Sequence, residues 1–360
     1  EITSDTVLAN NDLENNGKIN ATTSVEATNI TNSGEITSDT VLASNDLENN
    51  GKLNATTSVE ANNITNAGEI TTLTLIANSE LSNAENATIT ATNGSVTVGT
   101  NLTNAGTLST KTVTVTQNIT NSGSMNVATT NVGGNLTDKG TWNSDGIINF
   151  VGTNDQSFDS NPITTYALIN VEKSSGILTL ANDLNAKDFV LKGGDLFINK
   201  TLTTQSDVIL LGKKYSVKDS VTNVDLFDYK GEVEFEILDA TLLGTKVQLA
   251  DDASIFVGKN FYANGIDISG GKIFIQKPIN FAPFAQSFNG EISNNKAICS
   301  CADCETEANQ THAKIMAVGC VDKGENSGWD FDDATILKAQ TVRDDVIKVF
   351  VNQPLAKISD

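Results

Sequence analysis

The chain has 360 residues and a formal net charge of −21, because 44 Asp and Glu residues outnumber 23 Lys and Arg residues. Binding to nucleic acid or to an anionic membrane surface requires basic patches, so the composition argues against both. No apolar run reaches the roughly 18 residues of a membrane-spanning helix, so we expect no membrane span. No signal peptide is visible, so an exported form would be a mature or internal segment.

The first 140 residues are built from a repeated segment. Residues 1–34 recur with few changes at 35–68, and each unit of 34 residues splits into two 17-residue halves with one skeleton. One line of 21 residues, 86–106, and two further lines of 17 complete the region. A helical solenoid needs a longer repeat, and the Thr, Asn and Gly content opposes helix. Apolar and polar residues alternate as in strands, so each line is predicted to form one coil of a parallel β-solenoid.

Equivalent positions of successive lines carry matched residues. Apolar residues fill positions 2 and 13, and Asn fills position 15, where we expect it to face inward and bond from coil to coil. The two-residue alternation also places position 6 inward, which would leave no outward threonine array. Position 6 holds Thr6, Thr23, Thr40, Thr57, Thr74, Thr112 and Thr129.

Acidic residues alternate with other residues from line to line. Position 1 reads Glu1, Lys18, Glu35, Lys52 and Glu69, and positions 5, 9, 12 and 14 carry an acid in every second line of the first four. Stacking brings equivalent positions about 4.8 Å apart, where like charges repel. The 34-residue period is therefore predicted to keep carboxylates from stacking, although recent duplication of a two-coil unit would preserve the same period.

The later segments keep strand signals but lose the strict period. Residues 141–290 alternate apolar and polar residues between Gly, Asn and Asp turns and carry more aromatic residues, which predicts wider coils. Residues 291–335 are expected to form a Cys-containing cap, and 336–360 a strand and linker to a next domain or subunit.

The last predicted strand lies near Val346–Val351. Its apolar residues cannot bury themselves, so we expect this assembly strand to add to the edge of a neighbouring sheet. Those residues are Val346, Ile347, Val349 and Phe350. At the other end, Glu1 opens a full coil without a cap, so self-association or a longer chain is expected to complete both ends.

Four cysteines are the strongest candidates for a staple in the cap. They are Cys299, Cys301, Cys304 and Cys320, with His312 between the last two. An extracellular protein would by default form two disulfides, whose pairing the sequence leaves open. A tetrahedral zinc site and free thiols are the alternatives.

Six sequons place their Asn in outward positions and are candidate glycosylation sites. They are Asn20, Asn29, Asn54, Asn63, Asn118 and Asn135. The alternative is that Asn and Thr are the residues that solenoid turns ordinarily use.

Signals for catalysis are weak. A lyase-like site would need clustered carboxylates, a metal and a basic residue, yet the single Arg343 lies beyond the solenoid and the single His312 lies among the cysteines. The pairs Asp251–Asp252, Asp332–Asp333 and Asp344–Asp345 are typical of solvated turns. We expect no catalysis and no cofactor, and keep only calcium at Asp and Asn turns as an open interpretation.

Parts of the chain resemble bacterial surface proteins. The runs "LTNAGTLSTKTVTVTQNITNSGSMN" and "INVEKSSGILTLANDLNAKDFVLKGGDL" resemble coils of filamentous-haemagglutinin-type and autotransporter-type β-solenoids. "CVDKGENSGWDF" followed by "AQTVRDDVIKVFV" resembles the end of such a solenoid, running into a bacterial immunoglobulin-like domain. The resemblance implies secretion, surface display, and an adhesive or structural role.

We therefore expect an all-β protein with an extracellular structural function, as a segment of an S-layer, sheath, filament or adhesin stalk. The alternative is a carbohydrate-active or glycan-binding β-helix protein, either similar to polysaccharide lyases or an adhesin with a glycan-binding loop in 213–290. Expected partners are further copies or a continuation of the chain, and cell-surface glycans.

Overall fold

The structure is a computed structural model. It describes residues 1–211, 215–217, 235–237, 245–258, 261–264, 266–275, 290–293, 296–299, 315–316, 320–322, 324–326, 329–330, 336–343 and 346–351. The chain divides into two compact units, Glu1–Ile169 and Asn170–Asp360. Every regular element in the described residues is a strand, and none of them forms a helix that could cross a membrane.

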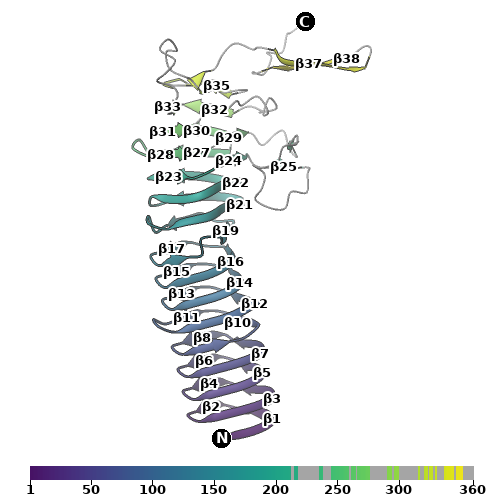
Figure 1. Cartoon of the computed structure of the whole chain (residues 1–360), viewed down its shortest axis with the longest axis vertical. Coiled ribbons are helices and arrows are strands. Elements are labelled where there is room, and N and C mark those ends of the chain that lie inside the picture. The colour runs from purple at the N-terminus through teal and green to yellow at the C-terminus, as the bar shows by residue number, and fades with distance from the viewer. Residues whose placement is uncertain are drawn as a thin grey trace. The chain divides into compact units, whose positions relative to one another are not determined.

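Unit 1 is a parallel β-solenoid, as the sequence predicts (Figure 1). Each coil holds one long strand, or two strands in its place, and one short strand. The long strands are β1 (Ile2–Leu8), β3 (Lys18–Ala27), β5 (Glu35–Ala43), β7 (Lys52–Ala61), β9 (Glu69–Thr71) with β10 (Thr74–Ala77), β12 (Thr88–Val98), β14 (Thr107–Val115) and β16 (Ser124–Val132). The short strands are β2 (Asp12–Asn15), β4 (Asn29–Asn32), β6 (Asp46–Asn49), β8 (Asn63–Asn66), β11 (Leu81–Asn83), β13 (Leu102–Asn104), β15 (Ile119–Asn121) and β17 (Leu136–Asp138).

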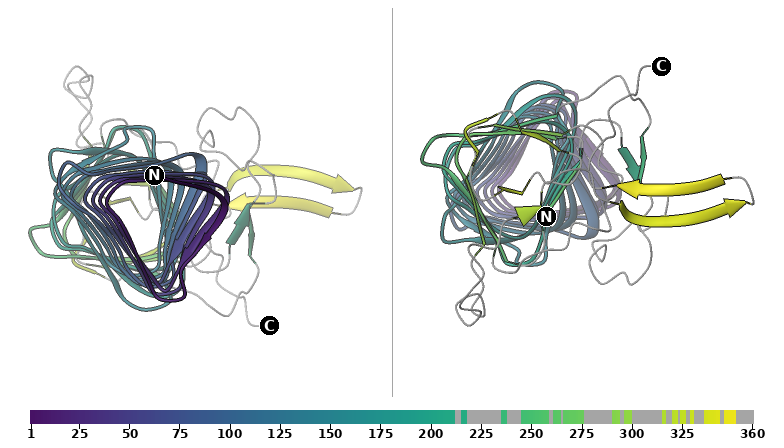
Figure 2. Two further views of the ribbon diagram at one scale, coloured as in Figure 1. Left: turned by 90° about the horizontal axis from the view of Figure 1, so that it is seen from below. Right: turned by 90° about the horizontal axis from the view of Figure 1, so that it is seen from above.

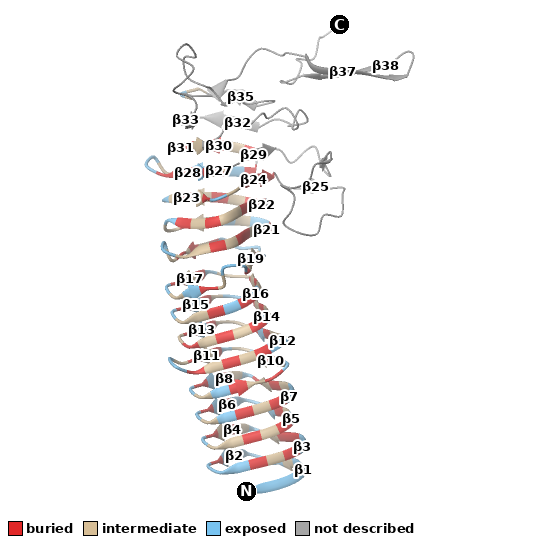
Figure 3. Ribbon diagram, viewed as in Figure 1, coloured by how far each residue is buried: buried red, intermediate tan, exposed pale blue. Residues whose placement is uncertain are grey.

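The first coils of unit 1 are roughly triangular when seen along the stack (Figure 2). The first half of each long strand forms face A, its second half forms face B, and the short strand forms face C. In the second coil each face buries two side chains, namely Ile19 and Ala21, Val25 and Ala27, and Ile30 and Asn32. Alternation of buried and exposed residues therefore holds along each face, as the bands in Figure 3 show.

The corner between faces A and B alternates in length in the first four coils. In the first and third coils one residue, Asp5 or Asp39, separates the two faces, whereas two threonines separate them in the second and fourth coils. The corner between faces B and C compensates with one residue fewer in the even coils, so face C returns to a common register. The backbone itself therefore repeats every two coils.

This bend corrects the prediction that position 6 faces inward. A strand that turns a corner changes which of its residues point into the core, and none of the position 6 threonines is buried. They lie on the outside of the solenoid. The bend also changes one charge row, since Glu26 pairs with Leu8 and Leu42 instead of Ala9 and Ala43.

Glycine at position 17 of each line is required by close stacking of the coils. A Cβ atom on Gly34 would lie 1.9 Å from the carbonyl oxygen of Gly17, and one on Gly51 would lie 2.1 Å from that of Gly34. No side chain can be accommodated at such distances, so the row stays glycine while neighbouring turn positions vary.

Larger side chains fill the end of unit 1, where the strict period stops. Its strands are β18 (Thr141–Trp142), β19 (Ile147–Phe150), β20 (Gln156–Asp159) and the beginning of β21 (Thr165–Leu180), within which the boundary between the units falls. Phe158 packs against Phe150 and Tyr166, with ring centroids 5.4 and 5.3 Å away. These aromatic residues widen the core, in line with the wider coils predicted after residue 140.

Unit 2 continues as parallel strands with a less regular period. Its solenoid strands are β22 (Leu184–Ile198), β23 (Thr201–Thr204), β24 (Val208–Leu211), β27 (Thr245–Leu249), β28 (Ser254–Val257), β29 (Phe261–Asn264), β30 (Ile266–Ser269), β31 (Lys272–Ile275), β32 (Gly290–Ser293), β33 (Lys296–Cys299) and β35 (Cys320–Asp322). Three separate pairs complete it, namely β25 (Tyr215–Val217) with β26 (Phe235–Ile237), β34 (Ile315–Met316) with β36 (Trp329–Asp330), and β37 (Ile336–Arg343) with β38 (Val346–Val351).

Candidate functional site

A row of buried asparagines runs along the inside of face C. Each side-chain amide donates a hydrogen bond to the side-chain oxygen of its equivalent in the next coil, with the shortest at 2.7 Å and the longest at 2.9 Å. The members are Asn15, Asn32, Asn49, Asn66, Asn83, Asn104 and Asn121. The same amides also bond turn carbonyls, as Asn66 does with Gly68 and Thr88. The predicted Asn row is confirmed, and its polar groups are satisfied inside the core.

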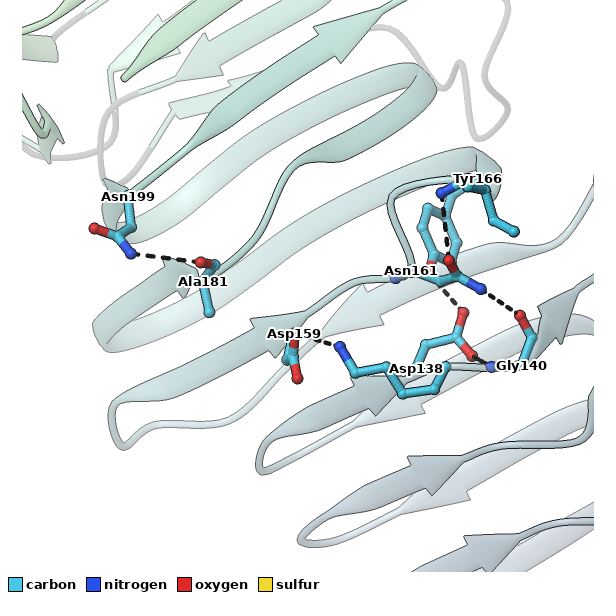
Figure 4. Close-up of polar contacts among 9 residues, drawn as sticks. Asp138, Gly140, Asp159, Asn161, Tyr166, Ala181 and Asn199 are labelled. Carbon is cyan, nitrogen blue, oxygen red and sulfur yellow. Dashed lines mark hydrogen bonds and ion pairs between the residues drawn. The ribbon is translucent and has the colours of Figure 1, made fainter. Parts of the chain in front are cut away.

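The row ends at Asp138, whose carboxylate accepts and does not donate (Figure 4). Its Oδ1 accepts from Asn121 Nδ2 at 2.7 Å and from the Gly140 N–H at 3.1 Å, while its Oδ2 accepts from the Tyr166 hydroxyl at 2.6 Å. The Asn161 N–H donates to the same phenolic oxygen at 3.1 Å. A ladder that passes donors in one direction needs an acceptor at its end, and Asp138 supplies it.

Tyr166 is fully buried beside this carboxylate. Its burial raises the pKa of the phenol well above its usual range, and the negative charge of Asp138 raises it further. The hydroxyl therefore stays protonated at neutral pH and serves as a permanent hydrogen-bond donor to the end of the row.

On the outside of unit 1, each acid is neighboured in the next coil by a donor or a cation. Lys18 Nζ lies 3.5 Å from Glu35 Oε2, the Thr22 hydroxyl donates to Asp5 at 2.9 Å, and Asn29 Nδ2 donates to Asp12 at 2.8 Å. The strand registers place these residues directly above one another, as the sequence predicts. Each exposed contact is worth less than about 1 kcal/mol, so the effect of the pattern lies in its repetition.

The six predicted glycosylation positions all lie on outer faces. Asn20 and Asn54 are on face A, and the other four are on face C; Asn135 is exposed and the rest are half-buried. Three face C amides, those of Asn29, Asn63 and Asn118, donate to the coil below at 2.8, 2.8 and 3.0 Å. A glycan on these nitrogens would replace such bonds, so they also fit the turn-residue interpretation.

Two other sequons are better placed for modification. Asn86 and Asn93 are both exposed and have φ values of 65° and 59°, at the corners of the coil that carries extra residues. The search for outward positions in a 17-residue frame missed them, because the 21-residue line does not fit that frame. Glycosylation stays a prediction at all of these positions.

The structure brings together few groups that could perform chemistry. Where the chain is described, no three or more His, Cys, Asp or Glu residues form a group that could hold a metal ion. Asp251 and Asp252 lie in an exposed turn, whereas Asp332–Asp333, Asp344–Asp345 and His312 lie outside the described residues. Calcium at the Asp and Asn turns stays a prediction.

Unit 2 carries two outward contacts that sequence reasoning did not identify. Lys192 Nζ lies 2.5 Å from Glu172 Oε1, with both side chains partly exposed. Phe256 and Phe274 stack on consecutive coils with ring centroids 4.4 Å apart and planes within 4°. Parallel pairing of β28 with β31 aligns these two phenylalanines, so register alone would have predicted the stack.

The cysteine calls cannot be followed to their side chains. Cys301 and Cys304 lie outside the described residues; Cys299 ends β33 and Cys320 begins β35, and only their backbone pairing is described. The predicted strand Val346–Val351 is confirmed as β38, and it contains the four assembly residues Val346, Ile347, Val349 and Phe350. It forms an antiparallel hairpin with β37, a partner strand that the sequence interpretation missed.

Comparisons of the chain with protein-family models, with curated proteins and with solved structures gave no match.

Proposed function

We propose that this chain is an extracellular structural protein of a cell surface, a shaft segment of an S-layer, sheath, filament or adhesin stalk that works without catalysis. The observation that carries the proposal is the asparagine ladder. It joins eight successive coils of unit 1, from Asn15 to Asp138, through buried side-chain bonds. Buried polar networks that are fully satisfied rigidify the structure around them, which is the property a shaft requires.

Two further observations support the same function. The core positions of unit 1 are filled by side chains from all three faces, with the largest aromatic residues fully buried. The outer surface repeats a few short polar patterns along the stack instead of gathering dissimilar groups at one place. Enzyme sites ordinarily bring several perturbed titratable groups into one cleft, and Tyr166, whose pKa is raised, is buried at the end of the ladder.

Negative-stain imaging of the native material, combined with cell fractionation, tests the proposal. We expect the protein at the cell surface, in filaments, sheets or rods whose fibre diffraction shows the strand spacing of about 4.8 Å. Single dispersed particles in the culture medium, together with cleavage of a polysaccharide substrate, would contradict it.

A further inference from the structure

Face B of unit 1 is the least charged of the three outer faces. Its first outward row consists only of Thr and Ser over eight coils, from Thr6 to Thr129. The second row carries acids only at Glu26 and Glu60. Face A instead carries alternating Glu and Lys, and face C carries Asp and Glu in every second coil.

Face B has no charged residue over its last five coils. We call the outward residues of these coils the neutral face. It consists of Thr74, Ile76, Ser95, Thr97, Thr112, Thr114, Thr129, Asn131, Ile147 and Asn149. In a chain with a net charge of −21, an uncharged stretch of this length marks the surface on which a partner of the same charge can approach.

Exposed aliphatic side chains gather around the same face. Four of the six exposed large hydrophobic residues of unit 1 lie in the second row of face B or at its corners, and the others are Ile2 and Ile163. The four are Leu8, Leu42, Leu73 and Val151. Apolar residues that cluster on one face of a soluble protein indicate a contact surface, whereas scattered ones do not.

We propose that the neutral face is a lateral docking surface for a second copy of this chain, so that two solenoids pack side by side through face B. This inference rests on the proposed structural function and names its partner. Two identical faces without carboxylates avoid the like-charge repulsion that faces A or C would bring. Threonine, serine and isoleucine in regular rows allow sheet-on-sheet packing at the usual separation of about 10 Å.

The size of the surface sets the expected strength of the contact. Five strands spaced about 4.8 Å apart and four residues of about 3.3 Å each give roughly 300 Å² per copy. This is below the roughly 800 Å² per partner of a stable complex. The contact between two free chains is therefore weak and depends on concentration, and it gains strength where many chains are held side by side.

Sedimentation velocity of the full 360-residue chain over a concentration series tests the proposal with two matched variants. Thr112→Glu with Thr114→Glu adds two carboxylates to face B within β14, and Thr107→Glu with Ser109→Glu adds two to face A of the same strand. Each pair replaces one residue that accepts a bond from the next coil, since Asn131 donates to Thr114 and Asn126 to Ser109, both at 3.3 Å. Circular dichroism verifies that both variants fold.

We expect the parent chain and the face A variant to associate reversibly, and the face B variant to raise the dissociation constant at least tenfold. Equal weakening by both variants, or a parent that stays monomeric while it binds insoluble cellulose through face B, would overturn the proposal. Failure of the structural function is a separate result: a soluble chain that is absent from the cell surface contradicts that function, whereas surface filaments formed equally well by the face B variant contradict only this inference.

Discussion

The Tyr166 hydroxyl lies 2.6 Å from Oδ2 of Asp138, and both residues are fully buried. This bond joins the wider coils to the last member of the asparagine ladder. It gives the buried carboxylate a third donor beside Asn121 and Gly140. The ladder therefore ends in a satisfied group, and an unpaired carboxylate oxygen in the core is avoided.

Tyr166→Phe should lower the free energy of unfolding by about 1–3 kcal/mol, because it leaves a buried carboxylate oxygen without its donor. The midpoint of chemical unfolding measures the loss. In an Asp138→Asn background the same change should cost less, since the carboxamide carries no charge to be satisfied. An equal loss in both backgrounds would show that the phenol acts through packing alone.

Alkaline pH should destabilise the protein through the same residue. An unfolded tyrosine loses its proton near pH 10, whereas burial and Asp138 raise the pKa of Tyr166 in the folded state well above this value. Below about pH 10 both states are protonated, and the contribution to stability is complete; above it only the unfolded chain ionises, so stability falls as the pH rises. Absorbance titration of tyrosinate should find one of the four tyrosines ionising only with unfolding, and Tyr166→Phe should remove this phase.

Asn66→Ala should be far more damaging than Asn63→Ala, although the two residues belong to one strand. Asn66 is buried and its amide donates to Asn83, Gly68 and Thr88, so its loss leaves several buried groups unpaired and should cost more than about 2 kcal/mol. Asn63 makes one outer bond to Asp46. Thermal unfolding of the two variants gives the comparison, and similar midpoints would show that the ladder does not support the solenoid.

Lys18→Glu combined with Lys52→Glu should stack glutamates through the first row of face A. Like charges in adjacent strands repel by about 0.2–1 kcal/mol for each pair, and salt screens this repulsion. The melting temperature should fall at low ionic strength and recover at high salt. The control, Lys18→Gln with Lys52→Gln, removes the cations without adding acids and should lie between the parent and the double Glu variant. A deficit that does not change with salt would contradict the electrostatic explanation.

The sequence predicted the features that depend on spacing along a straight strand. The 17-residue lines, the inward apolar positions, the Asn row and the alternation of acids with other residues all follow from equivalent positions in stacked coils. Parity failed where the chain bends, because the residues at Asp5 and at Thr22 and Thr23 change which side chains point inward. The bond between Asp138 and Tyr166 joins residues 28 positions apart, so no repeat position linked them.

The central claim, that two coils form the structural unit, is tested most directly by deletion. Deleting residues 35–68 removes two coils and leaves Lys18 stacked against Glu69, with unlike corners adjacent. Deleting 35–51 removes one coil, places Lys18 against Lys52 and Glu26 against Glu60, and stacks two long corners. If only length mattered, the shorter chain would be the less stable, because a solenoid loses interactions with each coil removed. Thermal unfolding should give the opposite order, with the two-coil deletion close to the parent and the one-coil deletion clearly lower; a one-coil deletion that is as stable as the two-coil deletion would contradict the claim.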